Sequence, residues 1–174
     1  MSRILLADDS PHAQRMGERI LREEGFEVVS LTDGDNTLLR LADVDPDLIL
    51  ADVFLPNKSG LDICRYVKSH PRHRHVRIVL TAGLLEPFDE GEAKLAGADA
   101  ILKKPFEASG VMQTIKPLLA EAQVARALYA ETAPDVPSAV DAERVRAAVT
   151  IALDAALPAM IKEITERVLI ALGH

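Results

Sequence analysis

The first 120 or so residues repeat one unit, a short apolar run followed by a longer amphipathic stretch. The apolar runs stand at 3–7, 26–31, 48–52, 76–80 and 98–103. Most are apolar throughout rather than at alternate positions, which is typical of parallel strands that are buried on both faces. Parallel strands need crossover connections, which are right-handed in almost all proteins. The repeat therefore predicts an α/β fold in which helices cover both faces of a parallel sheet.

Helices are expected in the amphipathic stretches. Ser10 followed by Pro11 is typical of a helix start, and Gly25 of a helix end. The remaining helices are predicted near 34–43, 59–69, 87–96 and 107–128. Pro117 should kink the last of these, because proline lacks a backbone N–H and its ring clashes with the preceding turn.

The chain changes character after residue 128. Residues 129–140 contain two prolines and no apolar period, which indicates a semi-extended linker. In residues 141–174 two apolar stripes lie on either side of Pro158, so we expect a tail of two helices. The stripes consist of Val145, Val149, Ala152 and Ala156, and of Leu157, Ile161, Ile164, Val168 and Leu172. So short a tail cannot bury a core alone, and it should pack on the first domain, on another protein or on a second copy, as a homodimer through the C-terminal helices.

Charge and cysteine content exclude some classes of partner and location. The 20 basic and 27 acidic side chains give a net charge of -7, which argues against nucleic acid and an anionic membrane surface as partners. No apolar run approaches the roughly 20 residues of a membrane helix. The single cysteine, Cys64, cannot form an internal disulfide, and the first apolar run meets two aspartates instead of forming a signal peptide. We therefore expect a cytoplasmic protein.

Five polar residues stand at the ends of the predicted strands. Asp8 and Asp9 follow the first strand, Asp52 ends the third, Thr81 follows the fourth and Lys104 follows the fifth. In an open parallel sheet the carboxyl ends of the strands form the binding cleft. Three carboxylates in one cleft repel each other unless a cation joins them, and oxygen ligands of this kind suit Mg²⁺. With a hydroxyl and a lysine facing the metal, the sequence predicts a site that binds a phosphoryl group.

These stretches resemble the receiver domain of two-component response regulators over about residues 3–120. The resemblance rests on "LLADDS", "LILADVFLPNKSGLD", "IVLTAG" and "GADAILKKPF", which stand in the order of the family. It implies a doubly wound, flavodoxin-like parallel sheet of five strands in the order 2-1-3-4-5, within a receiver domain of residues 1–128.

The resemblance also implies a role for each residue of the acidic cluster. Asp52 would accept a phosphoryl group from the phosphohistidine of a histidine kinase or from a small acyl phosphate. Asp9 would bind Mg²⁺ directly and Asp8 through water. The backbone carbonyl of Phe54 would be a further ligand.

The same resemblance implies that Thr81 and Lys104 contact the phosphoryl oxygens, and that the peptide from Lys104 to Pro105 is cis. The chain would then be a response regulator that signals through a downstream protein partner and turns over no external substrate. A phosphorelay intermediate that passes the phosphoryl group to a histidine phosphotransfer protein is the main alternative. Haloacid-dehalogenase-like phosphatases also use a strand-end aspartate with Mg²⁺, but they carry a second aspartate where this chain has Phe54.

Three residues differ from the usual pattern of receiver domains, and one segment rich in histidine has no role in that pattern. Ile101 stands where many receivers carry a switching Tyr or Phe, so aromatic switching is not expected. Phe54 and Gly83, two residues after Asp52 and Thr81, cannot orient a hydrolytic water, so the phosphorylated state should be long-lived. The segment "KSHPRHRHVR", with histidines at 70, 73 and 75, is expected to be a solvated loop rather than a metal site.

Overall fold

The computed structural model describes residues 1–132 and 140–171 of the 174-residue chain. Contacts divide the chain into two units, residues 1–137 and 138–174. Most of the predicted linker, and Leu172 of the second stripe, lie outside the described residues.

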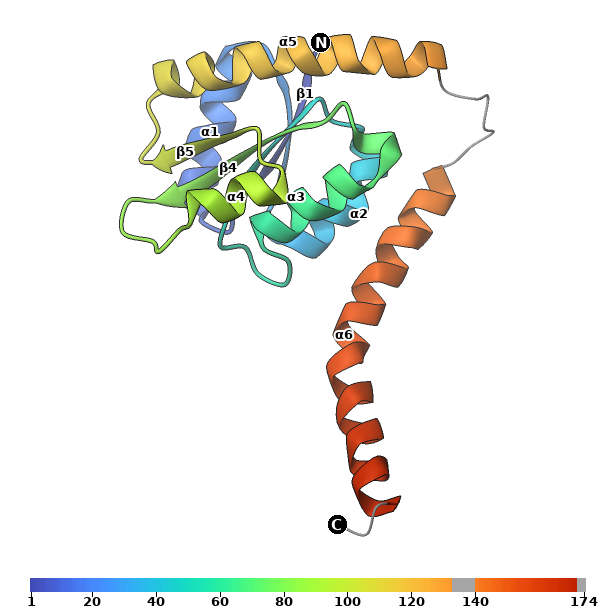
Figure 1. Cartoon of the computed structure of the whole chain (residues 1–174). Coiled ribbons are helices and arrows are strands. Elements are labelled where there is room, and N and C mark those ends of the chain that lie inside the picture. Colours follow the sequence, from blue (N-terminus) through green and yellow to red (C-terminus); the bar gives the residue numbers. More distant parts are fainter. Residues whose placement is uncertain (133–139, 172–174) are drawn as a thin grey trace. The chain divides into compact units, whose positions relative to one another are not determined.

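A parallel sheet forms the centre of the first unit (Figure 1). Its strands are β1 (Arg3–Ala7), β2 (Glu27–Leu31), β3 (Leu48–Asp52), β4 (Arg77–Gly83) and β5 (Ala100–Lys104). Neighbouring strands follow the order β2-β1-β3-β4-β5, and every pair is parallel. The predicted fold class and strand order are confirmed.

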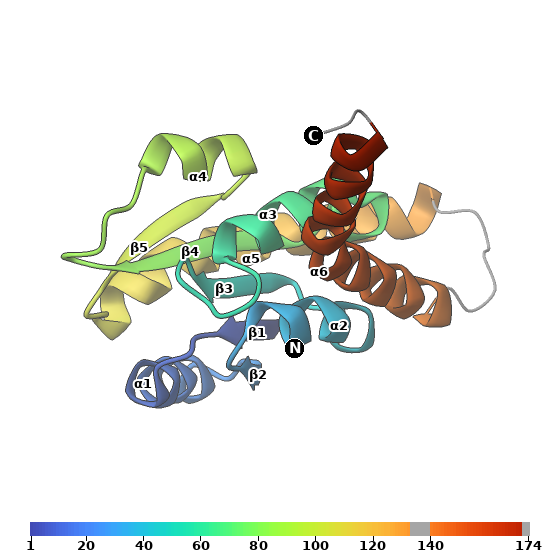
Figure 2. The ribbon, with the colours of Figure 1, turned by 90° about the horizontal axis from the view of Figure 1, so that it is seen from below.

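Helices cover both faces of this sheet. They are α1 (Pro11–Glu23), α2 (Gly34–Val44), α3 (Gly60–Ser69), α4 (Glu90–Ala96) and α5 (Ala108–Thr132), with a 3-10 turn η1 (Pro71–His73) before β4. Figures 1 and 2 show α1 and α5 on one face and α2, α3 and α4 on the other. The arrangement leaves the carboxyl ends of the strands at one edge of the unit.

The core explains why the strands read as continuous apolar runs. Alternate side chains of each strand point to opposite faces, so a strand covered on both faces needs apolar residues at every position. Leu5, Ile49 and Ile78 are fully buried, as are their neighbours Ile4 and Leu48 on the other face. Towards α1 and α5 the core contains Ile4, Leu6, Ile20, Leu21, Leu48, Leu50, Val79, Val111, Met112, Ile115 and Leu119.

The histidine segment differs from its prediction. His73 and His75 are only 1% and 5% exposed, so the prediction of a solvated loop is wrong for these two residues. The Nε2 atom of His75 lies 3.5 Å from a carboxylate oxygen of Asp45, and this acidic partner gives the buried ring a polar contact. Among the described residues, the histidines belong to no group of three side chains with the spacing of metal ligands.

α5 continues beyond its predicted end at residue 128. Residues 129–132 are helical, although they were expected to begin the linker, and Pro117 lies inside the helix. Alanine, leucine and glutamate, which have high helix propensity, dominate this part of the sequence. Propensity therefore extends the helix up to the edge of the proline-containing segment.

In the described residues of the second unit there is one helix, α6 (Val140–Ala171), instead of the predicted two. Pro158 removes one N–H from the helical ladder, but it does not end the helix. Residues with high helix propensity flank it in "DAALPAMIKE", and helical structure continues on both sides. Neither α6 nor any other helix in the described part of the chain combines the length and apolar character that crossing a bilayer requires.

Candidate functional site

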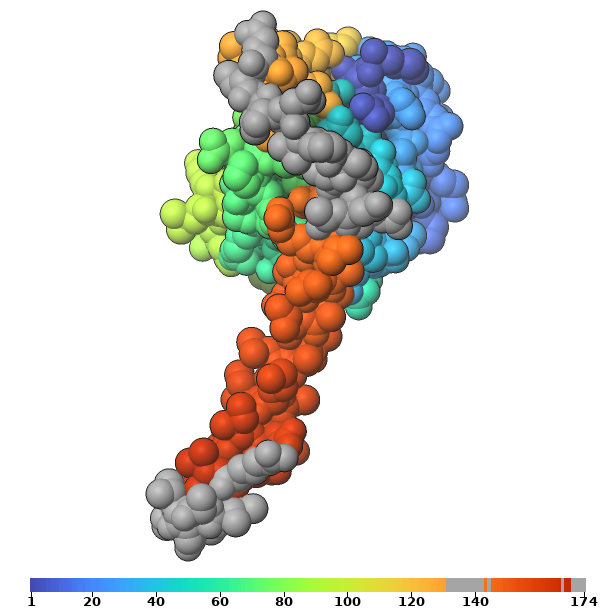
Figure 3. Space-filling view, turned by 90° about the vertical axis from the view of Figure 1, so that its right-hand side faces the viewer, coloured from blue at the N-terminus to red at the C-terminus, as the bar shows by residue number. Residues whose placement is uncertain are grey.

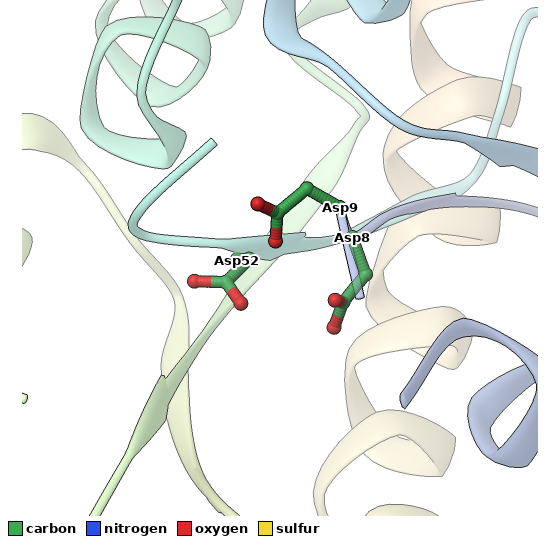
Figure 4. A group of neighbouring side chains, drawn as sticks. All are labelled: Asp8, Asp9 and Asp52. Atoms are coloured by element: carbon green, nitrogen blue, oxygen red, sulfur yellow. The ribbon is translucent and has the colours of Figure 1, made fainter. Parts of the chain in front are cut away.

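Three carboxylates meet at the carboxyl edge of the sheet (Figure 4). Asp8 and Asp9 lie in the turn after β1, and Asp52 is the last residue of β3. One carboxylate oxygen of each lies within 4.8 Å of those of the other two. Asp8 and Asp52 are 2% and 4% exposed, whereas Asp9 is exposed to solvent. The structure therefore brings together the acidic cluster that the sequence predicts.

Lys104 lies between the two buried carboxylates. Its Nζ atom lies 2.7 Å from Oδ2 of Asp8 and also donates a hydrogen bond to Oδ2 of Asp52. Burial alone would lower the pKa of Lys104, but the hydrogen bonds and charges of Asp52 and Asp8 outweigh burial and raise it. Lys104 is therefore a cation at neutral pH.

Backbone donors hold the other oxygens of the same two carboxylates. The N–H of Ser10 donates to Oδ1 of Asp8, and the N–H of Phe54 donates to Oδ1 of Asp52, both at 2.9 Å. Burial nevertheless raises the pKa of Asp8, because it outweighs the contributions of Lys104 and Ser10. Each buried aspartate thus has one oxygen bound by the backbone and the other by Lys104.

The charges at this edge do not balance within the chain. With Asp8, Asp9 and Asp52 ionised, three negative charges face the single positive charge of Lys104, which leaves two negative charges. A divalent cation with oxygen ligands would balance them, and these carboxylates are ligands of the kind that Mg²⁺ takes in proteins. The donor set therefore fits Mg²⁺.

Strand register places Thr81 beside Asp52. The two residues are direct partners between β3 and β4, and Thr81 is 2% exposed. The N–H of Val53, the residue after Asp52, donates to the Thr81 carbonyl at 2.9 Å. Thr81 is thus fixed by the sheet itself, which explains how residues 29 positions apart in the sequence come to adjoin each other.

Gly60 allows α3 to begin directly behind Asp52. A Cβ atom at this position would lie 2.4 Å from the Asp52 carbonyl oxygen, so only glycine fits without a shift of the backbone. The next turn is fixed by Ser59 and Asp62, since each side chain accepts the backbone N–H of the other at 3.1 Å. This helix start determines the position of the β3–α3 loop.

Glu86 at this edge was missed by the sequence analysis. Its carboxylate accepts the N–H of Gly83, at the end of β4. A Cβ atom on Gly83 would lie 3.0 Å from that carboxyl group. An acidic residue shortly after a strand end was the available signal, but nothing in the spacing indicates that the loop folds back.

A pocket of about 320 Å³ adjoins the site on the side of α1. It is lined by His12, Ala13, Met16, Lys104, Pro105 and Phe106. The peptide from Lys104 to Pro105 is cis, as the family resemblance implies. Phe54 lies elsewhere at the site, with its side chain 45% exposed and its backbone N–H bound to Asp52.

Comparison with protein families matches residues 4–116 to the response regulator receiver domain. Protein PilG of Pseudomonas aeruginosa is 26% identical over 114 residues, which are 66% of this chain and 84% of PilG. The DNA-binding response regulator MtrA of Mycolicibacterium smegmatis is 32% identical over 114 residues, but these are only 49% of MtrA. The chain thus spans most of PilG and about half of MtrA.

Solved structures show the same similarity. The receiver domain of the sensor histidine kinase PA1611 from Pseudomonas aeruginosa, solved with a magnesium ion coordinated in its active-site cleft, is 27% identical with a TM-score of 0.61. The match covers 68% of this chain and 98% of that structure. The family match ends at residue 116, so α6 lies outside it.

Proposed function

The chain belongs to the response regulator receiver domain family, and from this premise we propose that Asp52 is its phosphoacceptor. The family takes part in two-component signalling, and its members are not enzymes that turn over an external substrate. The observation that carries the proposal is the environment of Asp52. It is a buried carboxylate at a strand end, bound by Lys104 and by the Phe54 N–H, beside Thr81 and the two acidic residues after β1.

The proposed reaction is transfer of a phosphoryl group to a carboxylate oxygen of Asp52. A new P–O bond forms to this oxygen while the P–N bond of a phosphohistidine breaks, and the imidazole leaves with the bonding electron pair and takes up a proton. With a small acyl phosphate as donor, the leaving group is its carboxylate. The hydrogen bond from Phe54 fixes the orientation of the attacking carboxylate, which is a large part of catalysis in such transfers.

Lys104 and Thr81 would contact the transferred group. Lys104 is positively charged and already binds the acceptor carboxylate, so it is positioned to bind a phosphoryl oxygen once Asp52 loses its charge. Thr81 adjoins Asp52 across the β3–β4 register and offers a hydroxyl donor. Positive charge and donors aimed at the equatorial oxygens stabilise the transition state of phosphoryl transfer.

Asp8, Asp9 and Asp52, with the backbone carbonyl of Phe54, would hold Mg²⁺. When bound, the metal supplies positive charge against the phosphoryl oxygens. Asp8 is buried and oriented by the Ser10 N–H, while the exposed Asp9 leaves the site open to solvent. A chain-bound cation would also relieve the repulsion among the three carboxylates.

The proposal includes a protein partner through which the phosphorylated chain passes on its signal. α6 lies outside the matched family region and exposes apolar side chains along its length. The match to longer relatives such as MtrA covers only their receiver region, so their other activities are not assigned to this chain.

Intact-mass spectrometry tests the phosphoacceptor. Incubation with acetyl phosphate and Mg²⁺ should add one phosphoryl group to the native chain and none to Asp52→Asn. Asp43→Asn, the same substitution on the exposed surface of α2, should be phosphorylated like the native chain. Phosphorylation that persists in Asp52→Asn, or in the presence of a chelator, would overturn the assignment.

The metal site has a readout that does not depend on phosphorylation. Mg²⁺ should raise the midpoint of thermal unfolding of the native chain, because a ligand that binds only the folded state stabilises it. Asp9→Asn should reduce this rise without removing a buried contact. An equal rise in both proteins would contradict the proposed ligand set.

A further inference from the structure

One exposed apolar stripe runs along α6, the helix drawn from orange to red in Figure 3. We call it the α6 stripe, and it consists of Val149, Leu153, Leu157, Met160, Ile164 and Val168. Their side chains are 50 to 59% exposed. At 3.6 residues per turn they lie within about 100° of the helix circumference and extend roughly 30 Å along it. The α6 stripe takes Val149 from the first stripe seen in the sequence and Leu157, Ile164 and Val168 from the second. Leu153 and Met160, which the sequence analysis did not include, complete it.

Pro158 does not interrupt the α6 stripe. It lies about 130° around the helix from the centre of the stripe, on the side that carries Lys162. Lys162 and Glu166 approach within 4.0 Å of each other on that side, so the polar residues pair locally. The six apolar positions also repeat after eleven residues, and this period keeps the stripe nearly parallel to the axis of a straight helix.

The spacing of the α6 stripe reads the same in both directions. Its successive steps are four, four, three, four and four residues, centred between Pro158 and Ala159. A half-turn about an axis through this centre superimposes the six positions on themselves. In an antiparallel pair about this centre, each apolar position therefore lies level with an apolar position of the second helix, as suits a twofold interface between identical chains.

We propose that α6 pairs with α6 of a second copy of this chain in antiparallel orientation. Leu153 would then pack against the partner's Ile164, and Leu157 against the partner's Met160. Val149 and the partner's Val168 would lie at the same level near the ends of the pair. The proposal does not involve Asp52, so it stands or falls independently of the proposed phosphorylation.

Two observations favour a second copy in this orientation. The second unit has one described helix, so no other described element of that unit can cover the stripe. Antiparallel pairing also sets the positive end of each helix dipole beside the negative end of the other, whereas parallel pairing aligns like ends. The paired centre consists of leucine against isoleucine and leucine against methionine, which have similar volumes.

Light scattering tests the association. The 18.9 kDa chain should have twice this mass at tens of micromolar. Ile164→Glu, within the stripe and close to its midline around the helix, should return it to a monomer. Ala155→Glu is the matched control, because it adds the same charge about 170° around the helix from the stripe centre and should leave the dimer intact. A monomeric native chain, or a dimer that is insensitive to Ile164→Glu, overturns the proposal.

Cysteine cross-linking tests the orientation. Leu153→Cys and Ile164→Cys variants should each remain uncross-linked on oxidation, but their mixture should form a disulfide-linked heterodimer. The native chain, whose Cys64 is fully buried, controls for background reaction. A parallel pair would instead link each variant to itself. That result would retain the dimer but overturn the antiparallel register.

Discussion

The Nζ atom of Lys104 lies 2.7 Å from Oδ2 of Asp8, and the same nitrogen donates to Asp52. The two buried aspartates are therefore joined through one cation that the chain itself supplies. Asp9, the third carboxylate of the cluster, is instead exposed to solvent. This relationship determines how the site should respond when Lys104 is replaced.

Lys104→Met should destabilise the chain in the presence of a chelator. Removing one partner of a buried ion pair leaves the other charges uncompensated, and we expect a loss on the order of 3 kcal/mol. Mg²⁺ should restore stability more strongly in the variant than in the native chain, because the competing positive charge is gone. Thermal unfolding with and without Mg²⁺ measures both effects. Equal metal-induced shifts in the two proteins would show that Lys104 and the metal do not share these carboxylates.

Gly60→Ala should damage both stability and the proposed phosphorylation. The new Cβ would meet the Asp52 carbonyl at 2.4 Å, and the backbone must shift, which costs roughly 1 to 3 kcal/mol. Gly110→Ala is the matched control in α5, where a Cβ meets no atom within 4 Å. It should stabilise the helix by about 0.5 to 1 kcal/mol. Denaturant unfolding distinguishes the two, and equal effects would refute the close approach at Gly60.

Phe54→Asn should shorten the lifetime of phosphorylated Asp52, on the proposed function. An amide at this position can orient water against the phosphoryl group, which the native phenyl ring cannot do. Phe54→Leu is the control and should leave the lifetime unchanged. Gly83→Glu is a less direct test, since its side chain must displace the Glu86 carboxylate 3.0 Å away. A dephosphorylation rate that is the same for Asn and Leu at position 54 would rule out water orientation as the limiting factor.

Arg126→Met should weaken the attachment of α5 to the loop before β3. Arg126 donates to the Asp47 carboxylate at 3.0 Å and to the Asp45 carbonyl at 2.9 Å, and it also pairs with the Asp45 carboxylate. Hydrogen bonds to charged groups suggest a loss of roughly 2 kcal/mol at pH 7. Arg19→Met, which removes a surface pair with Glu23, should cost less than about 0.5 kcal/mol.

The Arg126 effect should depend on pH in a defined direction. Burial would raise the pKa of Asp45, but His75 and Arg126 outweigh it and hold the pKa below the ordinary 3.8. The unfolded chain therefore takes up this proton first as the pH falls, so the stability from ionised Asp45 is present above pH 3.8 and is lost below it. The difference between native chain and Arg126→Met should narrow below that pH. A constant difference down to pH 2 would contradict the linkage.

The place of the site was predictable because its residues lie at or near the carboxyl ends of strands, although Thr81 proves to lie within β4 rather than after it. Once the apolar runs define β1, β3, β4 and β5, parallel topology brings Asp8, Asp52, Thr81 and Lys104 to one edge without knowledge of any side-chain contact. The contacts of Arg126 could not be read in this way. They join residues about 80 positions apart through side-chain geometry that no period encodes.

The continuity of α6 shows a different limit of sequence reasoning. Proline carries a strong local penalty, and the prediction gave that penalty more weight than the helix propensity of the residues on both sides. In the structure the helix continues through Pro158. The burial of His73 and His75 was missed because a segment rich in histidine and arginine reads as polar, although its rings are enclosed by the surrounding fold.

The Arg126 contacts lie at the start of β3, whereas the acidic cluster lies at the end of the same strand. The contacts that attach α5 and the acidic cluster are therefore separated by the length of β3. Substitutions at the start of β3 can therefore change thermal stability while leaving Asp52, the proposed phosphoacceptor, in place. A lineage or a protein engineer can then alter the thermal stability of the chain through the Arg126 contacts without changing the surroundings of Asp52.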